Sequence, residues 1–165
     1  MPAIPPGVLH NPLAEILGQH LSLKHQGKVR DTYFLPDHPG LLLVVATDRI
    51  SIFDFVLNAE VAQKGEVLTA MTVFWQQKLF GRHDHCLVPS HVVAYGHDID
   101  DYLPESLRAN PDLQKRALVV KSLSMVKAEL IVRGYLTGSG WEAYQKTAPN
   151  HMLCGHSLPE SLCAG

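Results

Sequence analysis

Short apolar runs separated by turn residues dominate the chain, and they predict strands. Two of these runs flank Gly27 as the arms of a β-hairpin flank its turn. Pro36 to Gly40 has the composition of a further turn, and the leucine- and valine-rich run after it is continuously apolar. The predicted strands are residues 21–25, 29–35, 41–47, 117–123 and 129–136, with two shorter runs within 85–95 that Pro89 separates.

Helical spacing of apolar residues appears between these runs. Asn11 followed by Pro12 is a favourable helix start, because asparagine caps and proline suits the first helical position. Leu13, Ile16 and Leu17 then give this short helix one apolar face.

A longer helix is predicted over residues 69–80, where Gly81 supplies the C-terminal stop. Its apolar stripe consists of Met71, Phe74, Trp75 and Leu79. Residues 99–110 predict a short helical segment that Asn110-Pro111 ends, and residues 140–146 predict a last helix. No clear period follows Thr147.

This order of elements predicts an α+β fold with mostly antiparallel strands and one or two packed helices. Strands and crossover helices do not alternate, which excludes a doubly wound parallel sheet. Residues 48–54, which are polar and then aromatic, predict a loop after the buried strand at 41–47.

The composition narrows the class of protein. A chain of 165 residues with 46% apolar content suits one domain, or one small domain with part of another. A net charge of −2 argues against a nucleic-acid footprint. The longest apolar run, residues 41–46, is too short to cross a membrane, and the N-terminus lacks the features of a secretory signal.

The cysteines and histidines predict neither a disulfide nor a metal site. Cys86, Cys154 and Cys163 form no C-x-x-C pair, which indicates reduced thiols in the cytoplasm. His83 to Cys86 is a dense cluster of ligand types, but no second cluster has the spacing of a zinc site. A polar turn before a strand is the favoured interpretation.

The clearest ligand signal lies in residues 129–142. An apolar strand carries Arg133, a glycine-rich turn follows, and Ser139 and Glu142 have the spacing of a capping box. Helix starts offer unpaired N–H groups and a positive dipole end, so this motif suits a phosphate or carboxylate. The alternative is an ordinary helix start beside an arginine that faces solvent.

A second candidate is Gly27-Lys28-Val29-Arg30-Asp31. Glycine lets the backbone approach a ligand, and Lys28 and Arg30, two residues apart, are expected on one face of the strand. Two cations beside a glycine turn suit a polyphosphate. A solvated hairpin with basic residues on its wet face would look the same.

Two further candidates are polar residues beside apolar strands. Asp48, Arg49, Ser51 and Asp54 could hold a polar ligand or a magnesium-bound phosphate, or Asp48 and Ser51 could simply cap a turn. Lys121 lies within the apolar strand predicted over 117–123 and is similar to the phosphate-binding lysine of kinase-type small lobes, which lies on a core strand near a glycine loop; a lysine on an edge strand is the competing explanation.

The order of these motifs resembles the phosphoribosylaminoimidazole-succinocarboxamide synthase (SAICAR synthetase) family from about residue 27 to at least residue 159. The matching segments are Gly-Lys-Val-Arg-Asp, Ala-Thr-Asp-Arg-Ile-Ser-x-Phe-Asp, Lys-Gly-x-Val-Leu-Thr and Glu-x-Ile-Val-Arg-Gly-Tyr-Leu-Thr-Gly-Ser-Gly-Trp. The resemblance implies an antiparallel, kinase-small-lobe-like ATP-binding domain over residues 1–124. The start of a second, substrate-binding α+β lobe would follow over residues 125–165.

The resemblance implies an ATP- and Mg²⁺-dependent ligase of purine biosynthesis. It would join L-aspartate to the carboxylate of carboxyaminoimidazole ribonucleotide through an acyl phosphate, with no nucleic-acid or membrane partner. The implied nucleotide-binding residues are Gly27, Lys28, Arg30, Lys121 and Met125, the last at a hinge. The implied substrate-binding residues are Asp48, Ser51, Asp54, Arg133, Gly138 and Ser139, with Asp54 and Lys121 also in catalytic roles.

Two departures from the family pattern qualify these expectations. Lys127 stands where the family usually has proline, and the family's later segment of the type Asp-x-Lys-x-Glu-x-Gly does not occur in the chain. The chain is therefore expected to be an incomplete copy that cannot make the amide alone. The alternatives are a non-catalytic nucleotide-binding domain and, more remotely, a small module that binds phosphorylated partners or RNA.

Overall fold

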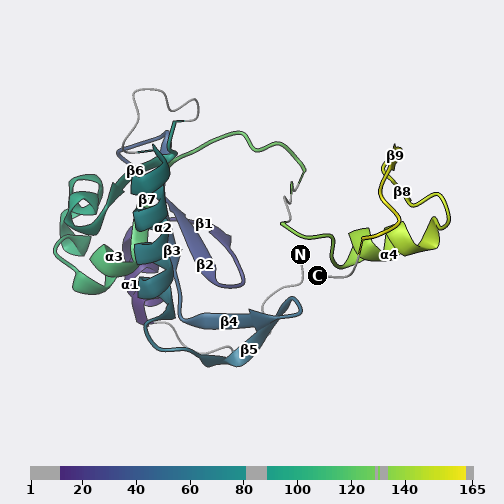
Figure 1. Ribbon diagram of the computed structural model, residues 1–165. Coiled ribbons are helices and arrows are strands. Elements are labelled where there is room, and N and C mark those ends of the chain that lie inside the picture. The colour runs from purple at the N-terminus through teal and green to yellow at the C-terminus, as the bar shows by residue number, and fades with distance from the viewer. Residues whose placement is uncertain (1–11, 81–88, 129, 131–133, 163–165) are drawn as a thin grey trace. The chain divides into compact units, whose positions relative to one another are not determined.

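The computed structural model describes residues 12–80, 89–128, 130 and 134–162. The chain divides into two compact units, Met1–Leu123 and Ser124–Gly165. The first holds a sheet with helices, and the second holds one helix and a small hairpin (Figure 1). Each unit is described by itself.

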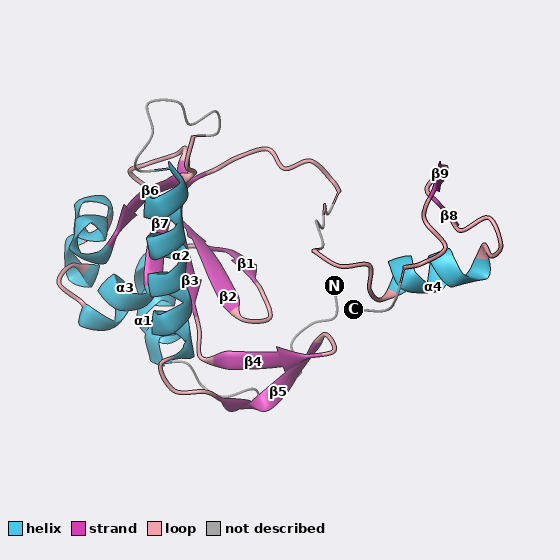
Figure 2. Ribbon diagram, in the orientation of Figure 1, coloured by secondary structure: helices cyan, strands magenta, loops and turns pink. Residues whose placement is uncertain are grey.

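A five-stranded sheet forms the centre of the first unit, as Figure 2 shows. All its neighbouring strands are antiparallel, in the spatial order β1-β2-β3-β7-β6. Tyr33 lies opposite Leu43, and Leu43 opposite Val119, across the three inner strands. The strands are β1 (Leu23–Gln26), β2 (Arg30–Phe34), β3 (Leu41–Ala46), β6 (Val92–Tyr95) and β7 (Ala117–Lys121). The predicted α+β class and antiparallel sheet are confirmed.

Alternation along the strands gives each face of the sheet its own apolar cluster. Tyr33, Leu43 and Val119 join residues of α1 (Pro12–His20) in one core. Leu42, Leu118 and Val120 form a smaller cluster on the other face, beneath α2 (Lys64–Phe80). The sheet is thus covered on both faces, and only the second face meets α2.

Helix α2 begins five residues before the predicted start at residue 69. The predicted stripe is wrong for Met71, Phe74 and Trp75, which are exposed. Gly65 and Thr69 are buried instead, and a Cβ on Gly65 would lie only 2.6 Å from the carbonyl oxygen of Ala46. Small residues let the helix approach the sheet, which apolar periodicity does not indicate. The Leu79 side chain and Gly81 lie outside the described residues.

The loop predicted over residues 48–54 is instead the first half of a hairpin. Strand β4 (Arg49–Ile52) pairs with β5 (Phe55–Glu60). Phe53 and Asp54 make the turn, with φ values of 47° and 69°. Positive φ at both central residues is typical of type I′ turns, which normally carry asparagine and glycine, so Phe-Asp gave no hairpin signal.

The predicted stop at Asn110-Pro111 is a helix start. Two 3₁₀ helices, Gly96–Tyr102 and Glu105–Leu107, precede it, and α3 (Pro111–Arg116) follows. The Asn110 Oδ1 atom accepts hydrogen bonds from the N–H groups of Asp112 and Leu113, at 3.0 and 3.2 Å. The same cap-then-proline pattern predicted a helix start at Pro12, where α1 begins; its cap residue, Asn11, lies outside the described residues.

The second unit contains α4 (Ser139–Lys146) and a hairpin of β8 (Met152–Leu153) and β9 (His156–Ser157). Buried Tyr144 stacks on Trp141 and on His151. The hairpin corrects the expectation of no order after Thr147. Of the strand predicted over 129–136, residues 130 and 134–136 are described, and none of them is in a strand.

Two features are absent from the described residues. Among them, no helix combines the length and apolar composition that crossing a membrane needs. In the same part of the chain, no three His, Cys, Asp or Glu side chains gather as they would around a metal ion. The cluster from His83 to Cys86 lies outside these residues.

Candidate functional site

The glycine turn between β1 and β2 is the first part of the site. The Gly27 N–H donates to the Arg30 carbonyl oxygen at 2.8 Å and closes the turn. A Cβ on Gly27 would lie 2.6 Å from that oxygen, so only glycine fits without a backbone shift. The sequence motif therefore places a tight turn, with Lys28 in it, at the end of the hairpin.

A buried ion pair lies directly under this turn. Arg49 and Asp31 are only 3% and 2% exposed, and the guanidinium contacts both carboxylate oxygens at 2.6 and 3.2 Å. The same guanidinium donates to the carbonyl oxygens of Gly27 and Lys28, at 3.0 and 3.1 Å. Arg49 at the start of β4 thus ties the turn to the interior. Sequence analysis placed both residues in candidate motifs but did not predict that they pair.

The structure brings Lys28 and Asp54 together from motifs 26 residues apart. The Lys28 Nζ atom lies 2.6 Å from an Asp54 carboxylate oxygen. Asp54 is 88% exposed and Lys28 is 42% exposed, so solvent screens the pair and it adds little stability. An anionic ligand could therefore take the place of Asp54 beside the ammonium group.

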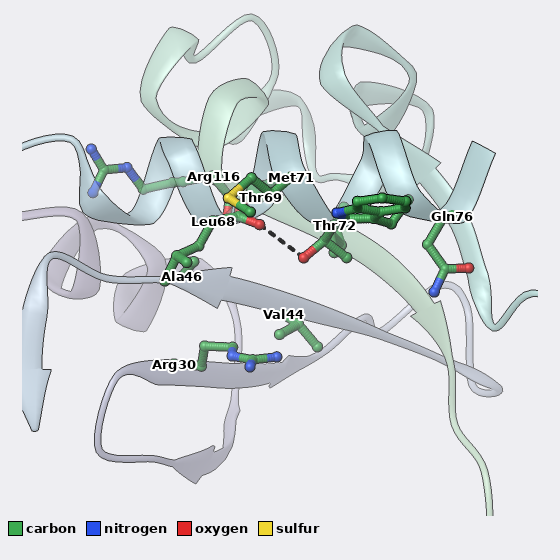
Figure 3. Close-up of a pocket in the computed structure, with 11 residues that line it drawn as sticks. Arg30, Val44, Ala46, Leu68, Thr69, Met71, Thr72, Gln76 and Arg116 are labelled. Atoms are coloured by element: carbon green, nitrogen blue, oxygen red, sulfur yellow. Dashed lines mark hydrogen bonds between the residues drawn. The ribbon is translucent and has the colours of Figure 1, made fainter. Parts of the chain in front are cut away.

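A cavity of about 390 Å³ lies between the sheet and α2, next to the second cation of the motif (Figure 3). Arg30 reaches it from β2, and Arg116 is the other cation of its wall. The remaining wall is largely apolar, including Val44, Leu118 and Trp75. Apolar walls with a few cations suit a flat, largely apolar group that carries a negative charge. Lys28 is not part of this wall.

Asp48 caps the start of α2, a role different from the turn cap that the sequence left open as its alternative. Its carboxylate accepts hydrogen bonds from the N–H groups of Gly65 and Gln63, at 2.8 and 3.3 Å, at the start of α2. Arg116 also lies 3.3 Å from it. Ser51 lies within β4 opposite Val56 and is partly buried.

Lys121 is the last residue of β7 and is exposed, after four buried residues of that strand. The edge-strand explanation for this lysine is wrong, because β7 lies between β3 and β6. Met125 is exposed in the irregular segment that begins the second unit.

In the second unit, α4 begins without the predicted capping box. Gly138, with φ of 58° and ψ of −137°, is the cap residue, and Ser139 is already helical and exposed. No side chain caps this start; the Glu142 N–H donates to the Gly138 carbonyl oxygen. Glycine occupies the cap because the backbone there has positive φ. Arg133 lies outside the described residues.

Lys64, at the first turn of α2, is a further group that sequence analysis passed over. Its Nζ atom is buried and finds no hydrogen-bond partner among the described residues. Burial lowers the pKa of Lys64; Asp48 opposes this effect, whereas Arg30 and Arg49 add to it. Its place in Lys64-Gly65-Glu66, which reads as a plain loop-to-helix entry, gave no sign of this environment.

Tyr33 makes the stability of this region depend on alkaline pH. Burial raises the pKa of Tyr33 from 10.0 to about 12. The negative charge of Asp31 adds to this effect, and the positive charge of Arg49 opposes it. The folded state therefore favours the neutral phenol. That stabilisation is fully present below pH 10 and is lost as the pH rises through 12. It amounts to about 3 kcal/mol.

We expect Tyr33→Phe to remove this part of the alkaline destabilisation. Urea unfolding at several pH values between 8 and 12 measures it, and Tyr135→Phe, at an exposed position, is the control. If the free energy of unfolding falls equally with rising pH in the wild type and in Tyr33→Phe, the assignment to Tyr33 is wrong.

Comparison with known protein families gives one family. The family model described as SAICAR synthetase matches residues 23–164. The chain is similar to the phosphoribosylaminoimidazole-succinocarboxamide synthase of Neisseria meningitidis serogroup B, with 46% identity over 136 residues. These cover 82% of this chain and 42% of that protein. The corresponding protein of Actinobacillus succinogenes is 46% identical over 86% of this chain and 46% of its own.

Solved structures show the same likeness. The Saccharomyces cerevisiae SAICAR-synthase complexed with SAICAR is 35% identical with a TM-score of 0.73, and another SAICAR synthase is 37% identical with a TM-score of 0.75. Both comparisons cover 95% of this chain and 50% of the solved one. The chain thus spans about half the length of the relatives that it matches.

Proposed function

Because the chain belongs to the SAICAR synthetase family, we propose that it forms the ATP-binding lobe and the beginning of the substrate lobe of a carbon–nitrogen ligase. The reaction would join L-aspartate to the carboxylate of carboxyaminoimidazole ribonucleotide in purine biosynthesis. The observation that carries the proposal is the closed glycine turn, where Lys28 lies on a buried arginine–aspartate pair. Such a turn suits the phosphates of ATP.

The chemistry follows from charge. A carboxylate is a poor acceptor for an amine, so the γ-phosphoryl group of ATP is first transferred to a carboxylate oxygen, giving an acyl phosphate and ADP. The aspartate amine then attacks the acyl carbon and phosphate leaves with the former carboxylate oxygen. Such catalysis needs positioning and neutralisation of oxygen charge rather than a protein nucleophile.

The proposed roles divide between the two units. Residues 1–124 would bind ATP, with Lys28 and Gly27 at the phosphates and Arg30 in the cavity under α2. Lys121 and Met125 would line the nucleotide cleft. Residues 125–165 would begin the substrate lobe. The proposed substrate-binding residues are Asp54, Asp48 and Ser51 of the first unit and Arg133, Gly138 and Ser139 of the second, with Asp54 and Lys121 in catalytic roles.

Mg²⁺ would accompany ATP in such an enzyme, but the described residues do not make a site for it. Asp48 is engaged at the start of α2 and Asp54 faces Lys28. In proteins, Mg²⁺ is usually coordinated by one or two carboxylates together with phosphate oxygens of the substrate. The small-molecule substrates are the proposed partners, without nucleic acid or membrane, and the cytoplasm is the proposed location.

Binding of ATP to the purified 165-residue chain tests the proposal. We expect Lys28→Met to weaken ATP binding about tenfold, because one charge-assisted contact is lost. Adenosine binding should stay unchanged. Isothermal titration calorimetry measures both ligands. Lys24→Met, at an exposed lysine of the same hairpin, is the control and should bind ATP normally. No ATP binding by the wild type, or equal binding by Lys28→Met, contradicts the proposal.

A non-catalytic nucleotide-binding domain is the second candidate, since the chain spans only about half of its relatives. Adding carboxyaminoimidazole ribonucleotide to the ATP titration separates the two. A ligase lobe binds the ribonucleotide with coupling to ATP, whereas the second candidate binds ATP alone. Under either candidate, the chain by itself should form no amide.

A further inference from the structure

The peptide groups of the glycine turn have an orientation that the protein imposes from below. Three consecutive carbonyl oxygens of the turn are held by residues near the start of β4. Arg49 donates to those of Gly27 and Lys28. Thr47 donates to that of Val29 through both its N–H and its Oγ1, each at 3.0 Å.

Because the peptide group is planar, holding a carbonyl oxygen also fixes the direction of the N–H group in the same peptide. In a trans peptide the C=O and the following N–H point in opposite directions. The peptides of this turn are trans, because the one cis bond of the described residues is Ala148-Pro149. The N–H groups of Lys28 and Val29 therefore point away from Arg49. Among the described residues, neither N–H donates a hydrogen bond.

We propose that Arg49, anchored by Asp31, is a positioning residue that orients the Gly27–Val29 turn to receive a phosphate of a polyphosphate ligand. The two free N–H groups and the Lys28 ammonium act as the donors. Arg49 does not touch the ligand. This inference rests on the proposed function for the identity of the ligand, ATP. It explains why the turn can accept the phosphates of that ligand.

The shape of the guanidinium explains why arginine is needed. Its donors reach four oxygen atoms at once: both carboxylate oxygens of Asp31 and the carbonyls of Gly27 and Lys28. A lysine ammonium carries the same charge but has three donors at one point and no rigid fork. Arg49→Lys therefore keeps the charge and loses the fixed geometry of the turn.

Titration of ¹⁵N-labelled chain with tripolyphosphate tests the inference. In the wild type, the amide signals of Lys28 and Val29 should shift most on binding. Arg49→Lys should bind tripolyphosphate about tenfold more weakly, as expected for lost charge-assisted contacts, while its adenosine affinity stays that of the wild type. A merely structural role would not separate the two ligands.

Arg108→Lys is the matched control. Arg108 also donates to a backbone carbonyl, that of Leu103 at 2.9 Å, so the substitution changes the same kind of contact elsewhere. It should bind tripolyphosphate like the wild type. If Arg49→Lys does not fold, the double variant Arg49→Met with Asp31→Leu replaces the buried pair by apolar groups. That variant should fold and still lose tripolyphosphate binding.

The outcomes separate this inference from the proposed function. The inference is wrong if tripolyphosphate does not shift the amide signals of Lys28 and Val29 in the wild type. It is also wrong if the Arg49 variant that folds binds tripolyphosphate as tightly as the wild type. ATP binding that depends on Lys28 would leave the proposed function standing in either case. Conversely, tripolyphosphate at the turn of a chain that ignores ATP supports the inference and contradicts the proposed function.

Discussion

Asp31→Ala is expected to lower the free energy of unfolding by about 3–5 kcal/mol, the usual effect of removing one partner of a buried ion pair. Arg49 is 3% exposed, so its charge would remain in the interior without a counter-ion. Solvent cannot replace the carboxylate there without opening the turn. Urea unfolding followed by circular dichroism at pH 7 measures the change.

Asp101→Ala is the control for this prediction, because Asp101 is an exposed aspartate of the same unit and its loss should change stability by less than about 0.5 kcal/mol. The double variant Arg49→Met with Asp31→Leu should recover most of the loss. Buried pairs contribute little net stability over apolar groups, while a lone buried charge is costly. A single variant as stable as the wild type would show that Arg49 reaches solvent.

Leu43→Ala is expected to be nearly as damaging, at about 2–5 kcal/mol. Leu43 is 0% exposed on β3, between Tyr33 and Val119 on the neighbouring strands. Truncation removes apolar contacts and leaves a cavity that strands paired on both sides cannot close. Domains of this size are commonly stable by only 5–15 kcal/mol, so a sizeable part of the total would be lost. Urea unfolding again provides the measurement.

Leu23→Ala is the matched substitution, since Leu23 lies on the edge strand β1 and is half exposed. It should cost well under half as much as Leu43→Ala. The two largest predictions also differ in kind. Leu43→Ala should bind tripolyphosphate normally in the fraction that remains folded, whereas the Arg49→Met, Asp31→Leu variant should be folded and fail to bind.

Local signals predicted much of the fold. The hairpin around Gly27, the apolar strand at β3 and the helix that begins at Pro12 depend on spacing and turn chemistry within a few residues, and all are present in the structure. The same rules failed where tertiary contacts decided. Phe53-Asp54 makes a hairpin turn with positive φ at both residues, although neither is the usual asparagine or glycine, and Arg49 of the same hairpin pairs with Asp31 of β2. Helix α2 buries the small residues Gly65 and Thr69, and the helix backbone at Gly65 lies too close to Ala46 of β3 for a larger residue.

The candidate site divides in the same way. The sequence by itself determined the family, the glycine turn and the cation Lys28, since each is written in consecutive residues. Only the tertiary structure decided that Asp48 caps α2, that Asp54 lies beside Lys28, and that Arg49 holds the turn from beneath. These contacts join residues 15 to 26 positions apart. Spacing along a chain predicts which side chains share a strand face, but pairing between segments depends on how the strands pack.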